Sequence, residues 1–357
     1  MTRRKIAESL MSIQDHSGSL VFAFFHPWTV QCGKLRPMLE QIIRHGFRVA
    51  AFNFHRLTER DVELLYAGNR PISRSTSWFI PRQLYEMGVS CGVILHREEQ
   101  GRTATSVMTE LKGKSQPFLN SPGQLRYDFR APNKSINLIH SSDDWASTIS
   151  EALLFFTPDE IELTLRKVRL AHFEECERSL LDHPAHAGMQ FVRDQSATAL
   201  LIKLRIRTLG LLRPVAEPTL CAPLFDFWNQ RLERNYLALD VHEEAKQYPS
   251  LLADEQRLAR PLLRSLRSSC NLDRPRRSLR RVPVAALTEF LQLLVEPDSY
   301  GEADTEALLS LPVFFDQWEE QLFKTTLLHF DELRYCQAGT PHHGSTVSRK
   351  AVAPTIP

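Results

Sequence analysis

The chain has no large excess of charge of either sign. Its 357 residues include 44 basic and 42 acidic side chains, which leaves a formal net charge of +2. Such a balance gives no overall reason to expect binding to a specific nucleic acid or to a membrane. The sequence also has no apolar run long enough to cross a bilayer, and its basic first residues are not followed by the apolar segment of a signal peptide. We therefore expect a soluble, cytoplasmic protein.

Metal-ligand patterns are absent as well. None of the six cysteines stands in a Cys-x-x-Cys pair or at metal-ligand spacing. The pair His342-His343 is too short to form a metal site. We interpret the cysteines as reduced intracellular thiols and predict no metal-binding residues.

The first part of the chain alternates short apolar runs with helical patterns. The length suits two domains, and a hydrophobic fraction of 43% is sufficient for a real core. Strands are expected at 20–25, 47–54, 89–96 and 136–139, and helices at 34–45, 58–66, 79–87, 103–112 and after 143. This order predicts an α+β fold of the ferredoxin-like (split βαβ) type, with a four-stranded antiparallel sheet covered by helices.

The fourth apolar run ends on His140, and a helix start follows at once. Ser142 or Asp143 can cap that helix, and Glu151 is a polar residue within it. An imidazole with a hydroxyl two residues on and a carboxylate within reach suits a nucleophile with an orienting partner. The alternative is a histidine at a sheet edge with ordinary hydrogen bonds.

The residues Asn137-Leu138-Ile139-His140-Ser141-Ser142-Asp143 resemble the signature Asn-x-x-His-Gly-Ser-Asp of nucleoside diphosphate kinases. The resemblance continues in order from about Leu20 to Glu160. It implies that His140 takes the γ-phosphoryl group of a nucleoside triphosphate such as ATP and passes it to a nucleoside diphosphate, with Mg²⁺ accompanying the nucleotide. It further implies that Glu151 orients the imidazole, directly or through Ser142.

The resemblance assigns nucleotide-binding roles to further residues. By this likeness Asn137 binds the sugar, Arg126 binds phosphate, and Tyr66 lies near the transferred phosphate. Phe79 would stack on the base, and Ser115 keeps the hydroxyl of a family threonine. Taken singly, Arg126 is better explained as an exposed arginine, and Tyr66 and Phe79 as aromatic members of the core.

Several family positions are changed. His26 stands where the family has a phosphate-contacting lysine, and Trp28 replaces an acidic residue. A family arginine falls near Thr109, and Ser141 replaces the glycine after the histidine. Loss of one charge-stabilising contact commonly slows a reaction by a factor on the order of a hundred to a thousand. The sequence thus leaves enzymatic activity open.

The second half is expected to be entirely helical. A clear helix start at Thr157-Pro158-Asp159-Glu160 opens it, and that helix is expected to run to about residue 181. Further helices are expected at 190–212, 223–245, 251–268, 284–295 and 304–333. We divide the chain into an N-terminal segment (1–18), a kinase-like domain (19–160), a helical domain (161–335) and a flexible tail (336–357).

Arginines crowd the region from Arg257 to Arg281, and an acidic stretch follows. This pattern suits an acidic partner, such as RNA or the surface of a cytoskeletal polymer, or simply a solvated helix face. The lack of aromatic residues among the arginines disfavours a base-stacking RNA surface.

Two hypotheses about function follow. The first is a catalytically weak or inactive kinase-like protein that serves as a structural or assembly component with protein partners. By analogy with kinase-like domains in cilia and flagella, it implies an axonemal location among microtubule-associated proteins. The alternative is an active nucleoside diphosphate kinase that works through phospho-His140.

Overall fold

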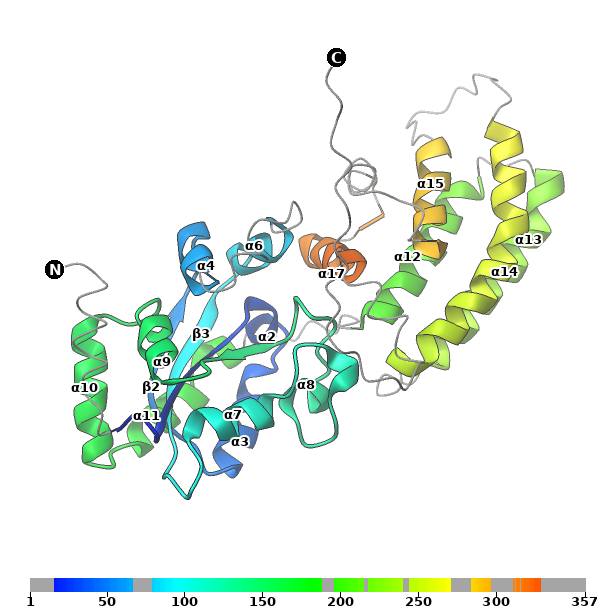
Figure 1. Ribbon diagram of the computed structural model, residues 1–357. Helices are drawn as coiled ribbons and strands as arrows, with labels where there is room; N and C mark the ends of the chain where they lie inside the picture. The colour runs from blue at the N-terminus through cyan, green and yellow to red at the C-terminus, as the bar shows by residue number, and fades with distance from the viewer. Residues whose placement is uncertain are drawn as a thin grey trace, which may run out of the picture.

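The computed structural model describes residues 16–66, 79–187, 196–214, 218–239, 244–270, 284–296, 311, 313–314 and 316–328. The sheet with its helices lies at one end of the molecule, and the helices α12 to α15 lie at the other, with α17 between them (Figure 1).

The sheet has four antiparallel strands in the order β2-β3-β1-β4. The strands are β1 (Leu20–Phe25), β2 (Arg48–His55), β3 (Ser90–His96) and β4 (Ile139–Ser141). All six residues of β1 are buried, because this strand is apolar on both faces and occupies an inner position in the sheet. The ferredoxin-like α+β fold predicted from the element order is therefore confirmed.

Helices cover both faces of the sheet. Val21, Ala23 and Phe25 of β1 point into a core that includes α3 (Leu35–Arg44) and α7 (Ala104–Lys112). The alternate residues of β1 point into a second core with α9 (Trp145–Ala152) and α10 (Pro158–Arg169). The remaining helices around the sheet are α2 (Pro27–Gln31), α4 (Glu59–Leu65), α6 (Phe79–Glu86) and α8 (Leu125–Asp128).

The turn before His140 differs from the prediction. The strand was expected over 136–139, whereas β4 begins at Ile139. Leu138 has φ +72°, so the chain turns there instead of running straight. Its carbonyl oxygen accepts hydrogen bonds from the N–H of His26 (3.1 Å) and from Thr29 Oγ1 (2.6 Å), which hold this conformation.

The cap of α9 also differs from the prediction. The N-cap is Asp144, not Ser142 or Asp143. Asp144 Oδ1 accepts the N–H of Ser147 (2.7 Å), and Ser147 Oγ accepts the N–H of Asp144 (3.0 Å). This reciprocal capping box leaves the hydroxyl of Ser142 available for another partner.

The helix predicted over 158–181 is broken into α10 and α11 (Glu174–Leu181). Ala171 adopts φ +54°, and the ring of Phe173 stacks on His96 with centroids 5.1 Å apart. Glu177 accepts a hydrogen bond from Arg48 Nε on β2 at 2.7 Å. The contacts of Phe173 and Glu177 with the sheet thus require the chain to turn, and the single helix predicted here is divided in two. Both helices lie against the sheet, although α10 crosses the boundary predicted at 160 and α11 follows it. The domain division itself stays a prediction.

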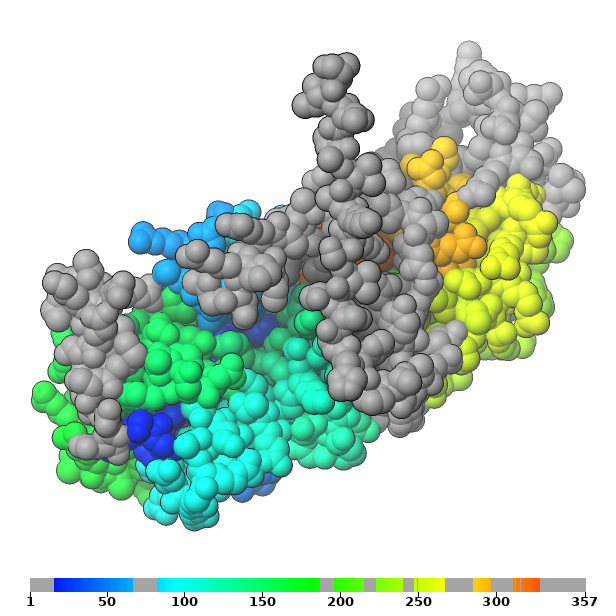
Figure 2. Space-filling model, viewed as in Figure 1, coloured from blue at the N-terminus to red at the C-terminus, as the bar shows by residue number. Residues whose placement is uncertain are grey.

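The remaining described chain is helical. It comprises α12 (Ala197–Leu212), α13 (Pro218–Leu237), α14 (Glu244–Cys270), α15 (Val284–Val295) and α17 (Gln317–Leu328). The start predicted at Pro223 was wrong, because α13 begins at Pro218 and contains Pro223. The yellow atoms of α14 form an outer surface at the end of the molecule away from the sheet (Figure 2). Within the described parts of the chain, no helix is long and apolar enough to span a membrane.

Candidate functional site

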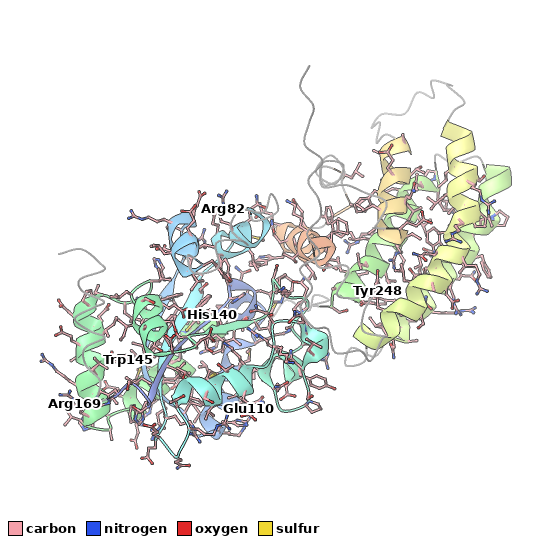
Figure 3. All side chains as sticks on the ribbon, viewed as in Figure 1. Arg82, Glu110, His140, Trp145, Arg169 and Tyr248 are labelled. Atoms are coloured by element: carbon pink, nitrogen blue, oxygen red, sulfur yellow. The ribbon has the colours of Figure 1, made fainter. Side chains whose placement is uncertain are left out.

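His140 lies in the middle of β4, paired with Phe24 of β1. Its Nε2 is 3.0 Å from Glu151 Oε2, and Ser142 Oγ donates to the same oxygen at 2.7 Å. The imidazole keeps 26% of its surface exposed. A carboxylate beside Nε2 favours the tautomer with the proton there, so Nδ1 carries the lone pair. Figure 3 labels His140 in the sheet part of the molecule. Nδ1 can therefore act as a nucleophile, and the contact of Nε2 with Glu151 orients the ring.

Arg126 is buried at the start of α8, and its guanidinium binds backbone carbonyls. It donates from Nε to Asn137 O (3.0 Å), from Nη1 to Gly113 O (2.7 Å) and from Nη2 to Ile139 O (2.7 Å). Burial lowers its pKa to about 10, against the attraction of Tyr66 and Tyr85. The predicted phosphate-binding arginine therefore supports the chain that leads into His140.

A second buried cation, Lys112, was not predicted. Its Nζ donates to Ser141 O at 3.0 Å and lies 3.8 Å from Asp143 Oδ1. Burial lowers its pKa to about 8, assisted by repulsion from Arg126. A lysine in the last turn of a helix usually faces water. The available sequence signal was its spacing of four residues from the buried Met108.

Together the two cations cover one edge of β4. Arg126 and Lys112 bind the carbonyl oxygens of Asn137, Ile139 and Ser141, which alternate along the chain. Alternate carbonyls of a strand point to the same side, and the other side of β4 pairs with β1. The strand that carries the histidine is thus held by a strand on one edge and by side-chain cations on the other.

His26 lies at the end of β1 and is only 1% exposed. Its ring stacks on Phe24 with centroids 5.4 Å apart, and Tyr85 Oη lies 3.4 Å from its Nε2. Burial, with repulsion from His140 and Arg126, holds the pKa of His26 well below its usual value. His26 is therefore uncharged near neutral pH.

Tyr66 joins His26 through Tyr85. The two phenol oxygens are 2.8 Å apart, and burial raises the pKa of both groups. Tyr85 was not anticipated as a site residue, because its position on α6 is that of an ordinary core aromatic. The rings of His26 and Tyr85 contact Phe24, whose ring is 5.2 Å from that of His140.

The other predicted residues are more loosely connected. Asn137 Nδ2 donates to Lys134 O at 3.1 Å, while its Oδ1 is buried and has no hydrogen-bond partner among the described residues. Ser115 Oγ bonds to Gln116 at 3.3 Å. Phe79 opens α6, and its side chain lies outside the described residues.

The changed family positions do not crowd the imidazole. The ring of Trp28 packs against Trp318 of α17, with centroids 5.5 Å apart. Ser141 is fully buried, next to His140 in a strand whose side chains alternate between faces. Thr109 is exposed on α7. Among the described residues, no cluster of three His, Cys, Asp or Glu side chains could hold a metal ion.

The arginine-rich region is described only in part. Arg257 pairs with Asp254 at 3.2 Å, and Arg260 lies 3.7 Å from Glu296. A cavity of about 290 Å³ between α13 and α14 is lined by Phe227, Gln230, Arg231, Arg234, Asp254, Arg257 and Leu258. The side chains from Arg267 to Arg281 and the tail predicted at 336–357 lie outside the described residues.

Known proteins are similar to this chain in the part that contains the sheet. The family model described as nucleoside diphosphate kinase matches residues 21–161. The nucleoside diphosphate kinase of Moorella thermoacetica is 27% identical over 143 residues, which cover 39% of this chain and 95% of the relative. That of Ehrlichia canis is 33% identical over 116 residues, covering 32% and 77%. A crystal structure of a nucleoside diphosphate kinase family protein from Babesia bovis has 22% identity, covers 40% of this chain and 90% of its own, and gives a TM-score of 0.35.

Proposed function

The chain belongs to the nucleoside diphosphate kinase family through residues 21–161, and we propose that it is a catalytically weak member that works as an assembly component together with its helical half. The observation that carries this proposal is the engagement of Arg126. All three nitrogens of its guanidinium donate to backbone carbonyls, so at most two of its five N–H donors remain for a phosphate, and moving the side chain toward one would leave buried carbonyls without partners.

The charge of the other site residues supports the same conclusion. His26 is buried and uncharged where the resemblance places a lysine, and Thr109 has no charge where it places an arginine. Phosphoryl transfer depends on cations that neutralise the phosphates in the transition state. Loss of one such contact slows a reaction by a factor on the order of a hundred to a thousand, so loss of both cations leaves little turnover.

The helical half supplies the assembly function in this proposal. Arg231, Arg234 and Arg257 line a cavity beside the exposed ring of Phe227, with Asp254 as the one carboxylate in its lining. Such a surface suits an acidic protein partner. The axonemal location stays a proposal that rests on family analogy.

A second function, active phosphoryl transfer, is favoured by the geometry around His140. Its Nδ1 would form a bond to the γ-phosphorus of a nucleoside triphosphate while the bond from phosphorus to the β,γ-bridging oxygen breaks and the diphosphate leaves. Attack by a second diphosphate reverses these steps. Glu151 holds Nε2, and Oδ1 of Asn137, which has no partner in the described part of the chain, offers an acceptor for a sugar hydroxyl.

Incubation with γ-labelled ATP separates the two functions. Acid-labile label on the wild type, absent from His140→Ala and removed by a nucleoside diphosphate, would support the active kinase. Absence of label, together with no ATP binding by calorimetry, is the result expected of the weak assembly component. The His140→Ala protein serves as the control for label on other side chains.

A further inference from the structure

Helix α17 contacts both segments that hold the turn before His140. We propose that Trp318, Thr325 and Thr326 of α17 are positioning residues for this turn (residues 133–138, the pre-histidine turn), so that the helical half controls how His140 is presented. The inference rests on the proposed function only in taking His140 as the reactive group.

The pre-histidine turn needs support, because it contains an unfavourable backbone conformation. Leu138 adopts φ +72°, a region that residues other than glycine rarely occupy. Such conformations cost on the order of 1–3 kcal/mol and persist when the surroundings impose them. The bonds of its carbonyl oxygen to the N–H of His26 and to Thr29 Oγ1 provide one support.

Asn133 provides the second support and connects it to α17. Its Oδ1 accepts the N–H groups of Ser135 (3.0 Å) and Ile136 (2.9 Å), which closes the turn. Its Nδ2 donates to Thr325 Oγ1 at 2.9 Å and to Thr326 Oγ1 at 3.3 Å. The amide is 4% exposed, so water cannot readily replace the threonine hydroxyls.

The first support also contacts α17. Trp28 lies between His26 and Thr29 in the chain, and its ring meets the edge of Trp318 at a centroid distance of 5.5 Å. Nearby, Gln321 Nε2 donates to Gln83 Oε1 on α6 at 3.0 Å. Figure 1 shows α17 between α6 and the helices α12 to α15. One helix of the second half therefore contacts both supports of the turn.

This arrangement couples the two halves. A partner that displaces α17 would remove the acceptors of Asn133 and the ring against Trp28, and the turn at Leu138 would be free to relax. Coupling of this kind is reciprocal, so a phosphate on His140 would change the stability of α17 by the same free energy. The helical half is then a regulator of the site as well as an interaction module.

Hydrogen exchange of the full-length chain tests the proposal without nucleotide. In Thr325→Val/Thr326→Val, deuterium uptake by the peptide covering 133–142 should become about three- to tenfold faster, the effect of one buried hydrogen bond. The matched control is Thr208→Val, since Thr208 is also fully buried in the helical half, but its hydroxyl donates to Leu204 O of its own helix and to no other described residue. Unchanged uptake by this peptide, with faster uptake confined to α17, would overturn the proposal.

A chemical readout addresses His140 itself. Phosphoramidate phosphorylates histidine without a nucleotide site, so its rate reports how Nδ1 is presented. The double variant should change the rate at His140, while Thr208→Val should match the wild type; equal rates in all three proteins would contradict the positioning role. Trp318→Leu provides a second variant if the double variant does not fold. Failure of ATP binding would count only against the alternative of an active kinase, and it leaves both readouts intact.

Discussion

Arg126 donates a hydrogen bond from Nη2 to the carbonyl oxygen of Ile139 over 2.7 Å, one residue before His140. An arginine that the sequence assigns to phosphate thus fastens the strand that bears the nucleophile. With Lys112 on Ser141 O, it covers the edge of β4 that no strand pairs among the described residues. Covered edges also protect a sheet from unwanted strand pairing.

Arg126→Met should lower the free energy of unfolding by about 3 kcal/mol, because three buried carbonyls lose a charged donor. Urea denaturation measures this change. Arg36→Met is the matched control, since Arg36 is half exposed and pairs with Glu40 on the surface of α3. That control should change stability by less than about 1 kcal/mol. An Arg126 variant with wild-type stability would contradict the structural role.

The buried lysine makes stability depend on pH. The pKa of Lys112 is about 8 in the folded chain against 10.5 for an ordinary lysine, so the unfolded state binds more protons between these values. Stability should therefore rise with pH through this window. Lys112→Met should lack this rise, as seen by comparing unfolding at about pH 7 and about pH 9.5. Lys114→Met, at an exposed neighbouring position, should keep the wild-type slope. Parallel slopes for wild type and Lys112→Met would disprove the assignment.

Glu151→Gln should slow phosphorylation of His140 by phosphoramidate on the order of ten- to a hundredfold, because the amide stabilises the charged imidazole less than the carboxylate does. The acid-labile label is followed over time. Ser150→Ala, an exposed change on the same helix, should leave the rate unaltered. If Glu151→Gln reacts as fast as wild type, the carboxylate does not activate the ring.

The helical half contains a buried ion pair, Arg205 with Glu255, whose charged atoms are 2.5 Å apart and whose side chains are fully buried. Burial raises the pKa of Glu255 despite the attraction of Arg205. Glu255→Gln leaves the guanidinium charge without a partner and should cost about 3–5 kcal/mol in stability. Asp254→Asn, next in the chain but partly exposed, should cost less than about 1 kcal/mol. Thermal unfolding compares the two, and equal melting temperatures would contradict the prediction.

The fold was largely predictable because its signals are local. The uninterrupted apolar run at 20–25 predicted β1, and Thr157 caps α10 at the predicted helix start, with Pro158 in its first turn. The helix predicted at 284–295 has those bounds as α15. Such patterns depend on neighbours in the chain, which a sequence displays directly.

The environment of the site was less predictable because it depends on distant residues. No local pattern reveals that Arg126 meets three carbonyls, that Lys112 is buried, or that Trp28 contacts Trp318 from the far end of the chain. The break at Ala171 likewise depends on contacts of Phe173 and Glu177 with the sheet. Long-range packing decided each of these features.

The most direct test of the account compares two phosphoryl donors on the same histidine. Wild type and His140→Ala are incubated in parallel with phosphoramidate and with γ-labelled ATP, and acid-labile phosphate at His140 is measured. We expect label from phosphoramidate on the wild type only, and at most a trace from ATP, because the nucleophile is oriented while the phosphate-binding cations are missing or engaged. Rapid labelling by ATP that a nucleoside diphosphate removes would contradict it and establish a working kinase.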